Sequence, residues 1–300
     1  MDKDPRAAQA LPSLAGIPRV PLRHPGRWIS GVLSAAVLVF LVHAFATSKI
    51  EWDYVRRFLT APAILHGVLN TLILTVCAMA LGIVLGLLVA LMRLSSSPVS
   101  RFVASGYIWF FRGTPIYLQL LLWFNLALVF QTIGLPGVWQ IGTVTLMTPF
   151  LAALLGLGVC QGAYTAEVIR AGILSIDAGQ YEAAQALGMR RTQAMRKIVL
   201  PQTLRVIMPT LGNEVISMLK TTSLAAAIDY QEVIHSASLI YYVNNRVIEL
   251  LCICAIYYLV TVTVLSYLQR KLEQRLARSL NRVNPARAGT AAPAIVEVTA

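Results

Sequence analysis

Long runs of apolar residues, separated by short polar stretches, recur along most of the chain. Six of these runs are long enough to cross a hydrocarbon core of about 30 Å as helices that rise about 1.5 Å per residue. They cover residues 28–46, 66–92, 107–130, 149–170, 205–228 and 247–268. The pattern predicts an all-α fold, a polytopic transmembrane helical bundle with six spans.

The two ends of the chain have a different pattern. Residues 1–27 are basic and rich in proline, and residues 283–300 are rich in alanine, proline and glycine without an amphipathic period. We expect both to be disordered, as an N-terminal arm and a C-terminal tail. The first apolar run ends in Ala-Phe-Ala at residues 44–46, which imitates a signal-peptidase site. The length of the run and the extended basic segment before it favour a retained anchor helix.

The composition of the chain agrees with a membrane protein. Of its 300 residues, 57% are hydrophobic and only 13% are charged, and a soluble domain of this length carries more charge. Four cysteines lie inside apolar runs, where they behave as small hydrophobic residues: Cys77, Cys160, Cys252 and Cys254. We expect all four to be structural and neither disulfide-bonded nor metal-binding.

The basic residues of the chain lie mainly in the segments on one side of the predicted spans. The formal net charge of +12 comes from 25 Lys and Arg against 13 Asp and Glu. Basic residues occupy the N-terminal arm and residues 93–101, 190–197 and 270–282, whereas residues 131–148 carry no charge. From the positive-inside rule we expect both termini and the two basic loops, residues 93–101 and 190–197, to be cytoplasmic. The excess charge therefore reports topology, and nucleic acid is not an expected partner.

Two pairs of glycines lie at GxxxG spacing inside predicted spans. The pairs are Gly82 with Gly86, and Gly158 with Gly162. Such spacing lets helices approach closely, either between subunits or within one bundle, although small residues are also common in any membrane helix.

The most informative polar segment covers residues 180–201. A short helix with a small apolar face is predicted by Ala183, Ala184, Ala186 and Leu187. Gly188 supplies a flexible stop, and Arg190 begins a second, basic helix that we expect Pro201 to end. Two short helices that project from a membrane bundle form a docking element for the groove of a partner.

Patterns that mark an enzyme are absent from the sequence. It contains no GxxxxGK[ST] phosphate loop, no His, Cys and carboxylate cluster at metal spacing, and no Ser-His-acid set in a plausible loop. We therefore expect no catalytic residues, no metal site and no cofactor.

The segment Glu182-Ala183-Ala184, followed by Gly188 and by Ile198-x-Leu200-Pro201, resembles the EAA signature of permease subunits of bacterial ATP-binding-cassette importers. In that family the loop is a coupling helix that sits in a cleft of the ATPase subunit. The resemblance assigns contact with the ATPase to Glu182, Ala183, Ala184, Gly188, Ile198, Leu200 and Pro201.

The resemblance extends over residues 66–275 and is to the polar-amino-acid uptake branch, which has the type I importer fold. It is carried by Asn70-Thr71-Leu72, Phe111-Arg112-Gly113-Thr114-Pro115 with Gln119, Gly162-Ala163-Tyr164-x-Ala166-Glu167, Gly212-Asn213-Glu214 and Leu219-Lys220-x-Thr222-Ser223-Leu224. The branch usually has five core spans, so residues 28–46 would be an additional N-terminal helix. Thr221 departs from the branch, where an acidic or another polar residue is common, and this leaves the charge preference for the substrate open.

The resemblance implies a permease that imports polar amino acids across the bacterial inner membrane as a multi-pass protein. Its implied partners are a dimer of ATPase subunits, a periplasmic amino-acid-binding protein, a second permease subunit (identical or homologous), the substrate and membrane lipid. ATP would be hydrolysed by the partner. The alternative is an ion- or proton-coupled secondary transporter in which Glu167 and Glu214 relay protons, although such proteins usually show inverted repeats and need no docking helix.

Ionisable residues at or inside the spans are the candidates for a substrate path, because each costs at least a few kcal/mol unless it is paired or faces water. They are Arg112, Glu167, Arg170, Glu214 and Lys220. Glu167 and Glu214 suit the ammonium group of an amino acid and Arg112 suits its carboxylate. Gln119, Thr222 and Ser223 complete the predicted path. A purely structural alternative pairs Arg112 with Glu167, or Arg170 with Glu214.

Overall fold

The computed structural model describes residues 25–47, 50–135 and 138–283. The chain divides into two units, Met1–Ile50 and Glu51–Ala300. The described part of the first unit is helix α1 (Pro25–Thr47), which confirms the predicted apolar helix. This helix begins within the last residues of the segment expected to be disordered. The remainder of that segment, residues 1–24, lies outside the described residues.

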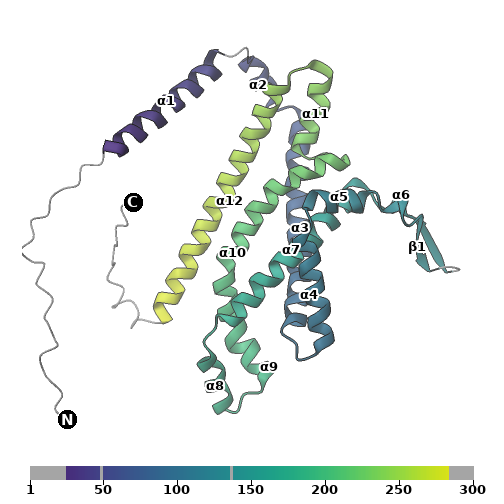
Figure 1. Cartoon of the computed structure of the whole chain (residues 1–300), viewed down its shortest axis with the longest axis vertical. Helices are drawn as coiled ribbons and strands as arrows, with labels where there is room; N and C mark the ends of the chain where they lie inside the picture. Colours follow the sequence, from purple (N-terminus) through teal and green to yellow (C-terminus); the bar gives the residue numbers. More distant parts are fainter. Residues whose placement is uncertain (1–24, 48–49, 136–137, 284–300) are drawn as a thin grey trace, which may run out of the picture. The chain divides into compact units, whose positions relative to one another are not determined.

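The second unit is a bundle of helices (Figure 1). Its longer elements are α2 (Trp52–Phe58), α3 (Pro62–Arg93), α4 (Pro98–Gly113), α5 (Ile116–Phe124), α7 (Pro149–Leu174), α8 (Ala178–Ala186), α10 (Leu200–Thr221), α11 (Val233–Asn244) and α12 (Val247–Val283). The shorter elements are η2 (Leu126–Leu128), β1 (Thr132–Leu135), β2 (Trp139–Gly142), α6 (Thr143–Leu146), α9 (Arg191–Ala194), η3 (Met195–Val199) and η4 (Thr222–Ile228). The predicted disordered tail, beyond the end of α12, lies outside the described residues.

Four helices of the described chain are long and apolar enough to cross a bilayer by length and composition. They are Trp28–Thr47, Pro62–Arg93, Pro149–Leu174 and Val247–Leu276. They coincide with four of the six predicted spans. The other two predicted spans are present but are not single α-helices.

The predicted span 107–130 is broken at Thr114 and Pro115. Both residues are extended, because a residue before proline avoids the helical region and proline cannot donate a backbone hydrogen bond. The amide of Gln119 restores part of the lost bonding. It donates to the carbonyl oxygens of Phe111 at 3.1 Å and of Thr114 at 3.2 Å. The chain therefore contains two short helices, α4 and α5, joined by a capped break.

The predicted span 205–228 begins earlier and ends differently. Helix α10 starts at Leu200, and after Thr221 the chain continues as the 3₁₀ helix η4. Pro201 lies in the first turn of α10. We had expected Pro201 to end the preceding helix, and this expectation was wrong. The π-helix η3 instead joins α9 directly to α10.

Helices α3 and α7 form the close contact at the centre of the bundle. Gly82 and Gly86 of α3 lie against the side chains of Gln161 and Thr165, and Gly158 and Gly162 of α7 lie against Leu81 and Leu85. The two GxxxG pairs thus make a contact within the bundle. Buried apolar side chains extend this contact toward α5: Leu74, Ala78, Leu120, Ala153 and Leu157.

Residues of the Asn70-Thr71 motif anchor the connection between η4 and α11. The Asn70 side-chain amide donates to the carbonyl of Gln231 at 2.8 Å, and Thr71 Oγ1 accepts from the backbone N–H of Val233 at 3.2 Å. Glu232 in this connection is fully buried and accepts hydrogen bonds from the His235 backbone and the Tyr258 hydroxyl. These contacts give the motif a structural role.

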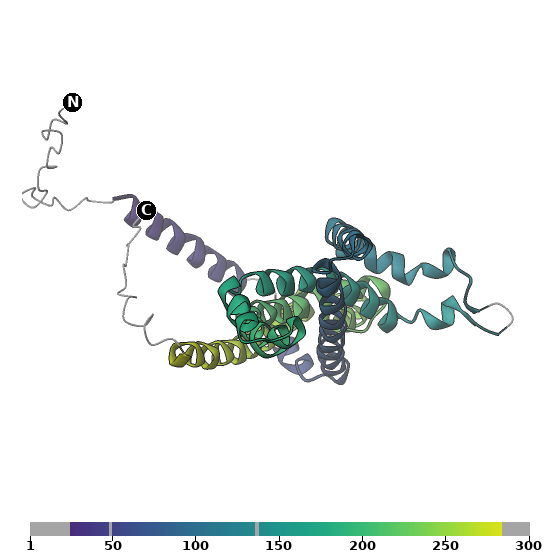
Figure 2. The same cartoon turned by 90° about the horizontal axis from the view of Figure 1, so that it is seen from below.

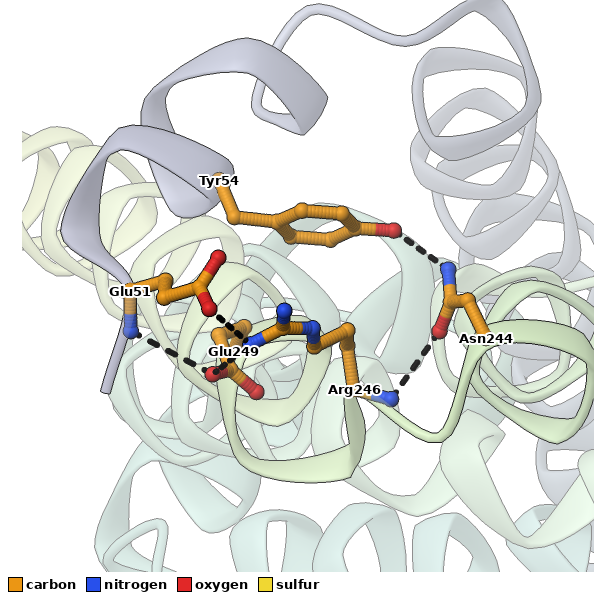
Figure 3. A network of polar contacts seen from close by, with 5 residues as sticks. All are labelled: Glu51, Tyr54, Asn244, Arg246 and Glu249. Carbon is orange, nitrogen blue, oxygen red and sulfur yellow. Dashed lines mark hydrogen bonds and ion pairs between the residues drawn. The ribbon is translucent and has the colours of Figure 1, made fainter. Parts of the chain in front are cut away.

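A polar network holds α2 against the turn between α11 and α12 (Figure 3). The Arg246 guanidinium lies 2.5 Å from the carboxylate of Glu51 and 3.7 Å from that of Glu249. The Glu51 carboxylate raises the pKa of Arg246 above its ordinary value. Tyr54 places its ring against the guanidinium and its hydroxyl on the side chain of Asn244. This network lies at the end of the bundle opposite α8 and α9 (Figure 1).

The connection between α5 and α7 contains the one β structure of the described chain. Strands β1 and β2 pair antiparallel, with Ile133 opposite Ile141 and Leu135 opposite Trp139. The predicted all-α bundle is otherwise confirmed.

Candidate functional site

Two neighbouring cavities lie between α4, α5, α7 and α10. The first has a volume of about 550 Å³ and the second about 250 Å³, and Tyr164 and Glu214 line both. The first is also lined by Arg112, Glu167, Val168, Ala171, Gly172, Ser175, Val206, Ile207 and Thr210. The second is also lined by Ile116, Leu157, Cys160, Gln161, Ser217, Met218 and Thr221. Three of the residues predicted from the sequence, Arg112, Glu167 and Glu214, therefore meet at one cavity.

Glu167 forms an ion pair with Arg170, which lies one turn further along the same helix, α7. Two nitrogens of Arg170 donate hydrogen bonds to the Glu167 carboxylate: Nε lies 3.3 Å from Oε1 and Nη2 lies 2.8 Å from Oε2. Residues three apart on a helix are neighbours, so this pair forms without any tertiary contact. Both structural pairings that we had considered, Arg112 with Glu167 and Arg170 with Glu214, were wrong.

Glu214 of α10 contacts a neutral partner. Its Oε2 accepts a hydrogen bond of 3.0 Å from the side-chain amide of Gln161, which also contacts Thr165 Oγ1 at 3.3 Å. Among the described residues, no Lys or Arg forms an ion pair with this carboxylate. A carboxylate that accepts from one amide keeps its remaining lone pairs for a ligand.

Arg112 provides the opposite charge at the same cavity. It lies in the last turn of α4, where the helix dipole favours a cation, and its guanidinium carbon is 5.2 Å from the centre of the Tyr164 ring. Within the described chain, no carboxylate lies at ion-pair distance from Arg112. Among the described residues, the cavity thus presents Arg112 and Glu214, neither of which forms an ion pair, together with the paired Glu167.

The other residues of the predicted substrate path lie away from these two cavities. Gln119 is buried in the break between α4 and α5 and lines a separate apolar pocket. The Thr222 hydroxyl donates to the carbonyl of Leu219 at 2.7 Å, and the Ser223 hydroxyl donates to that of Lys220 at 2.7 Å. Their contact with substrate stays a prediction.

The predicted path missed the two residues that contact Glu214 and Arg112 at the cavities. Gln161 donates a hydrogen bond to Glu214, and Tyr164 lies against the Arg112 guanidinium and lines both cavities. A signal for Gln161 is present in the sequence, since it is the one amide in the apolar run 149–170 and lies four residues before Thr165. Its pairing with Glu214 across 53 positions has no local signature.

The proposed coupling segment forms the helical pair expected from the sequence. Helix α8 begins after Asp177, whose carboxylate accepts from the backbone N–H of Gly179, and it ends before Gly188, which has a positive φ of 75°. The predicted short helix and glycine stop are confirmed. Glu182 and Ala183 are exposed.

Ala184 does not belong to the exposed face. Its side chain is buried within the chain itself, so the apolar face expected to enter a partner is smaller than predicted. Of the remaining residues assigned to this element, Ile198 and Leu200 are half-buried and Pro201 is exposed.

The sequence of this chain is similar to a known family and to characterised transport proteins. Residues 82–278 match the model of the family described as the binding-protein-dependent transport system inner membrane component. The arginine transport system permease protein ArgU of Corynebacterium glutamicum is 41% identical over 96% of this chain and 91% of its own length. The glutamine transport system permease protein GlnP of Escherichia coli is 33% identical over 75% of this chain and 98% of its own length.

A solved structure agrees with these relatives. The crystal structure of an amino acid ABC transporter with histidines contains a chain that is 36% identical to this one, with a TM-score of 0.67. The match covers 76% of this chain and all of the other.

Proposed function

Because this chain belongs to the family of binding-protein-dependent transport system inner membrane components, we propose that it is the permease subunit of an ATP-binding-cassette importer for polar amino acids. In this proposal residues 66–275 form the permease domain and the termini face the cytoplasm. The three similar proteins named above favour this function over an ion-coupled secondary transporter, because they are amino-acid ABC permeases.

The observation that carries the proposal is the position of Glu214 on α10. This helix starts at Leu200, where η3 joins it to the α8–α9 pair, and it lines the charged cavity from Val206 to Glu214. Fourteen residues separate these two positions, which is about 21 Å of helix at 1.5 Å per residue. One helix thus connects the segment proposed to dock on the ATPase with the residues proposed to contact substrate.

The free charges of the cavity match the two charged groups of an amino acid. Arg112 would bind the α-carboxylate and Glu214 the α-ammonium, while Tyr164 and Thr221 offer aromatic and hydroxyl contacts between them. A second permease subunit would cover the open side of the cavity, since a free carboxylate and guanidinium do not face lipid. An ATPase dimer would supply the energy and a periplasmic binding protein the substrate.

The experiment that tests this function is amino-acid-stimulated ATP hydrolysis by the complete complex in proteoliposomes, with its binding protein. Hydrolysis that rises with one or a few polar amino acids supports the proposal and identifies the substrate. Uptake that survives ATP depletion while an ion gradient is held would contradict it.

A substitution tests the coupling segment separately. Replacing the exposed Glu182 with Trp should abolish stimulated hydrolysis and uptake while leaving membrane insertion intact, because the side chain would not fit a cleft shaped for α8. Arg101→Trp is the matched control, since Arg101 is exposed near the start of α4, in the other basic segment. Wild-type uptake in the Glu182→Trp variant would remove the docking role.

A further inference from the structure

Helices α7 and α10 lie side by side, and the two cavities follow one another along them (Figures 1 and 2). On α7 the second cavity extends from Leu157 to Tyr164, and the first extends from Tyr164 to Ser175, toward α8. On α10 the first cavity ends at Glu214 and the second begins there. Tyr164 and Glu214 therefore mark the boundary between the cavities, and the second cavity is the one farther from the coupling segment.

The wall of the second cavity contains more buried side chains than that of the first. Its buried residues are Leu157, Cys160, Gln161 and Met218. The wall of the first cavity contains exposed residues on both helices, which include Ala171, Ser175, Val206 and Thr210. A binding site buries most of its ligand, so the second cavity is the better site for a substrate side chain. Its volume of about 250 Å³ exceeds the about 150 Å³ that holds benzene, so its size excludes few side chains.

Glu214 is the one charged side chain that the described residues contribute to the wall of the second cavity. The remaining wall is apolar or carries a neutral polar group, and its residues are Ile116, Leu157, Cys160, Gln161, Tyr164, Ser217, Met218 and Thr221. Lys220 precedes Thr221 in the chain but lines neither cavity. Because Glu214 binds the α-ammonium group in the proposed function, no counter-charge remains for an ionised side chain.

The charges of the two cavities together balance those of a zwitterion. Arg112 and Glu214 match a carboxylate and an ammonium group, and Glu167 is paired with Arg170. An amino acid with an uncharged side chain therefore leaves no charge without a partner. An ionised side chain adds one unpaired charge away from water, which should weaken binding about tenfold or more.

Two hydroxyl groups in the wall of the second cavity can bind a neutral polar side chain. The Thr221 hydroxyl donates to the carbonyl of Ser217 at 2.9 Å, so its oxygen remains an acceptor. The Ser217 hydroxyl forms no hydrogen bond within the described chain, so it can donate and accept. A side-chain amide has both donors and an acceptor and can use both hydroxyls.

We propose that the second cavity binds the side chain of the substrate and selects uncharged side chains that form hydrogen bonds, such as the amides of glutamine and asparagine. This inference rests on the proposed function, since it takes from it the positions of the α-carboxylate at Arg112 and the α-ammonium group at Glu214. Amino acids with ionised side chains, which include arginine, lysine, aspartate and glutamate, are excluded by charge and not by size.

Direct binding to the membrane complex, without the binding protein, tests this selectivity, because the selectivity of another protein then makes no contribution. The complex is isolated through a tag on this chain and placed in lipid nanodiscs. Radiolabelled glutamine is then displaced by unlabelled amino acids. Glutamine and asparagine should displace it at concentrations about tenfold or more below those of arginine, lysine, aspartate and glutamate. Equal displacement by an amino acid with an ionised side chain, or no specific binding of glutamine, overturns the proposal.

A change of charge in the second cavity should change the preferred substrate. Thr221→Asp supplies a counter-charge for a cationic side chain, and it should raise the affinity for arginine and lysine about tenfold or more. Thr221→Asn is the matched control, because asparagine has the shape of aspartate without its charge. Ser217→Asp with Ser217→Asn repeats the comparison if a Thr221 variant fails to accumulate. Equal affinity for arginine in the Asp and Asn variants overturns the assignment of the side chain to this cavity.

Stimulated ATP hydrolysis by the complete complex separates this inference from the proposed function. Hydrolysis that rises with arginine or glutamate and not with glutamine refutes the selection of uncharged side chains and leaves the proposed function standing. Hydrolysis that no amino acid changes contradicts both.

Discussion

Substitution of Gly86 by alanine tests the close contact between α3 and α7. A Cβ atom at this position would lie 2.6 Å from Cβ and 2.7 Å from Cγ2 of Thr165, and 3.0 Å from the backbone nitrogen of Ala166. None of these atoms belongs to the end of a flexible side chain. One of the two helices must therefore shift to admit a single methyl group.

The expected cost follows from a comparison with Gly106, which lies inside α4. A Cβ atom at Gly106 would meet nothing within 4 Å. Both substitutions gain the same helix propensity, up to about 1 kcal/mol for Gly to Ala, so this contribution cancels between the two variants. The difference between them is the overpacking cost, which is about 1–3 kcal/mol for an extra methyl group in a close-packed core.

Thermal unfolding in detergent, followed by the fraction of protein that remains monodisperse after heating, measures this difference. For a chain of this size it corresponds to a separation of roughly 2–12 °C, with Gly86→Ala the less stable variant. Adding Thr165→Ser to Gly86→Ala removes Cγ2 and keeps the hydroxyl, so part of the loss should return. Equal melting temperatures for Gly86→Ala and Gly106→Ala would refute the close approach of α3 and α7.

Two further predictions concern ion pairs. Arg170→Gln should lower the yield of folded protein, because it leaves Glu167 without its cation in a membrane helix. The double variant Glu167→Gln/Arg170→Gln should recover that yield. The cost of breaking the pair lies below the roughly 3–5 kcal/mol of a fully buried pair, since the side chains of Arg170 and Glu167 are 32% and 23% exposed. Arg246→Ala should release α2 and speed tryptic cleavage within it, whereas Asp53→Ala, at a fully exposed pair, should leave the rate unchanged. Unchanged cleavage in Arg246→Ala would show that the network does not hold α2.

The long apolar runs could be predicted because their length and composition alone decide that they are membrane helices. α3 and α7 each begin with a proline in the first turn, and that residue is a helix start signal in the sequence itself. The break at Thr114 and Pro115 is marked by the proline and not by hydropathy, because the apolar run continues on both sides of it. Hydropathy averages over a window longer than such a break, so one interrupted span and one continuous span have the same profile.

The cavity could be predicted only in part. The cost of charge in a membrane singled out Arg112, Glu167 and Glu214, and all three line the same cavity. Which side chain contacts each of these charged residues depends on the positions that the fold gives them. Glu167 with Arg170 is a pair three residues apart, which the rule for helix neighbours allows, although from the sequence we had paired both residues with others. Gln161 with Glu214 joins two different helices, and no local rule relates them.

Pro201 shows how one residue type supports opposite predictions. In the sequence it follows a basic segment and reads as a helix end. In the structure the backbone N–H of Leu200 bonds to the carbonyl of Met195, five residues back, so the turn before Pro201 is a π-helix. The side-chain amide of Gln202 donates to the carbonyl of Ile198 at 3.1 Å and so occupies an acceptor in the widened turn. Proline is then tolerated because it stands in the first turn of α10.

The continuity that results has a mechanical consequence for the proposed coupling. A loop between α9 and α10 would absorb a displacement by rotation about a few backbone bonds. Here η3 runs into α10 without a loop, and the backbone N–H of Leu200 bonds to the carbonyl of Met195, so a displacement of the docking helices would reach α10. At Pro209 the ladder of α10 loses a donor, and the side chain of Gln269 on α12 bonds to the carbonyl of Pro209 at 3.3 Å and to the side chain of Asn213 at 3.0 Å. Movement of α10 would therefore carry Glu214 and pull on α12 at this point.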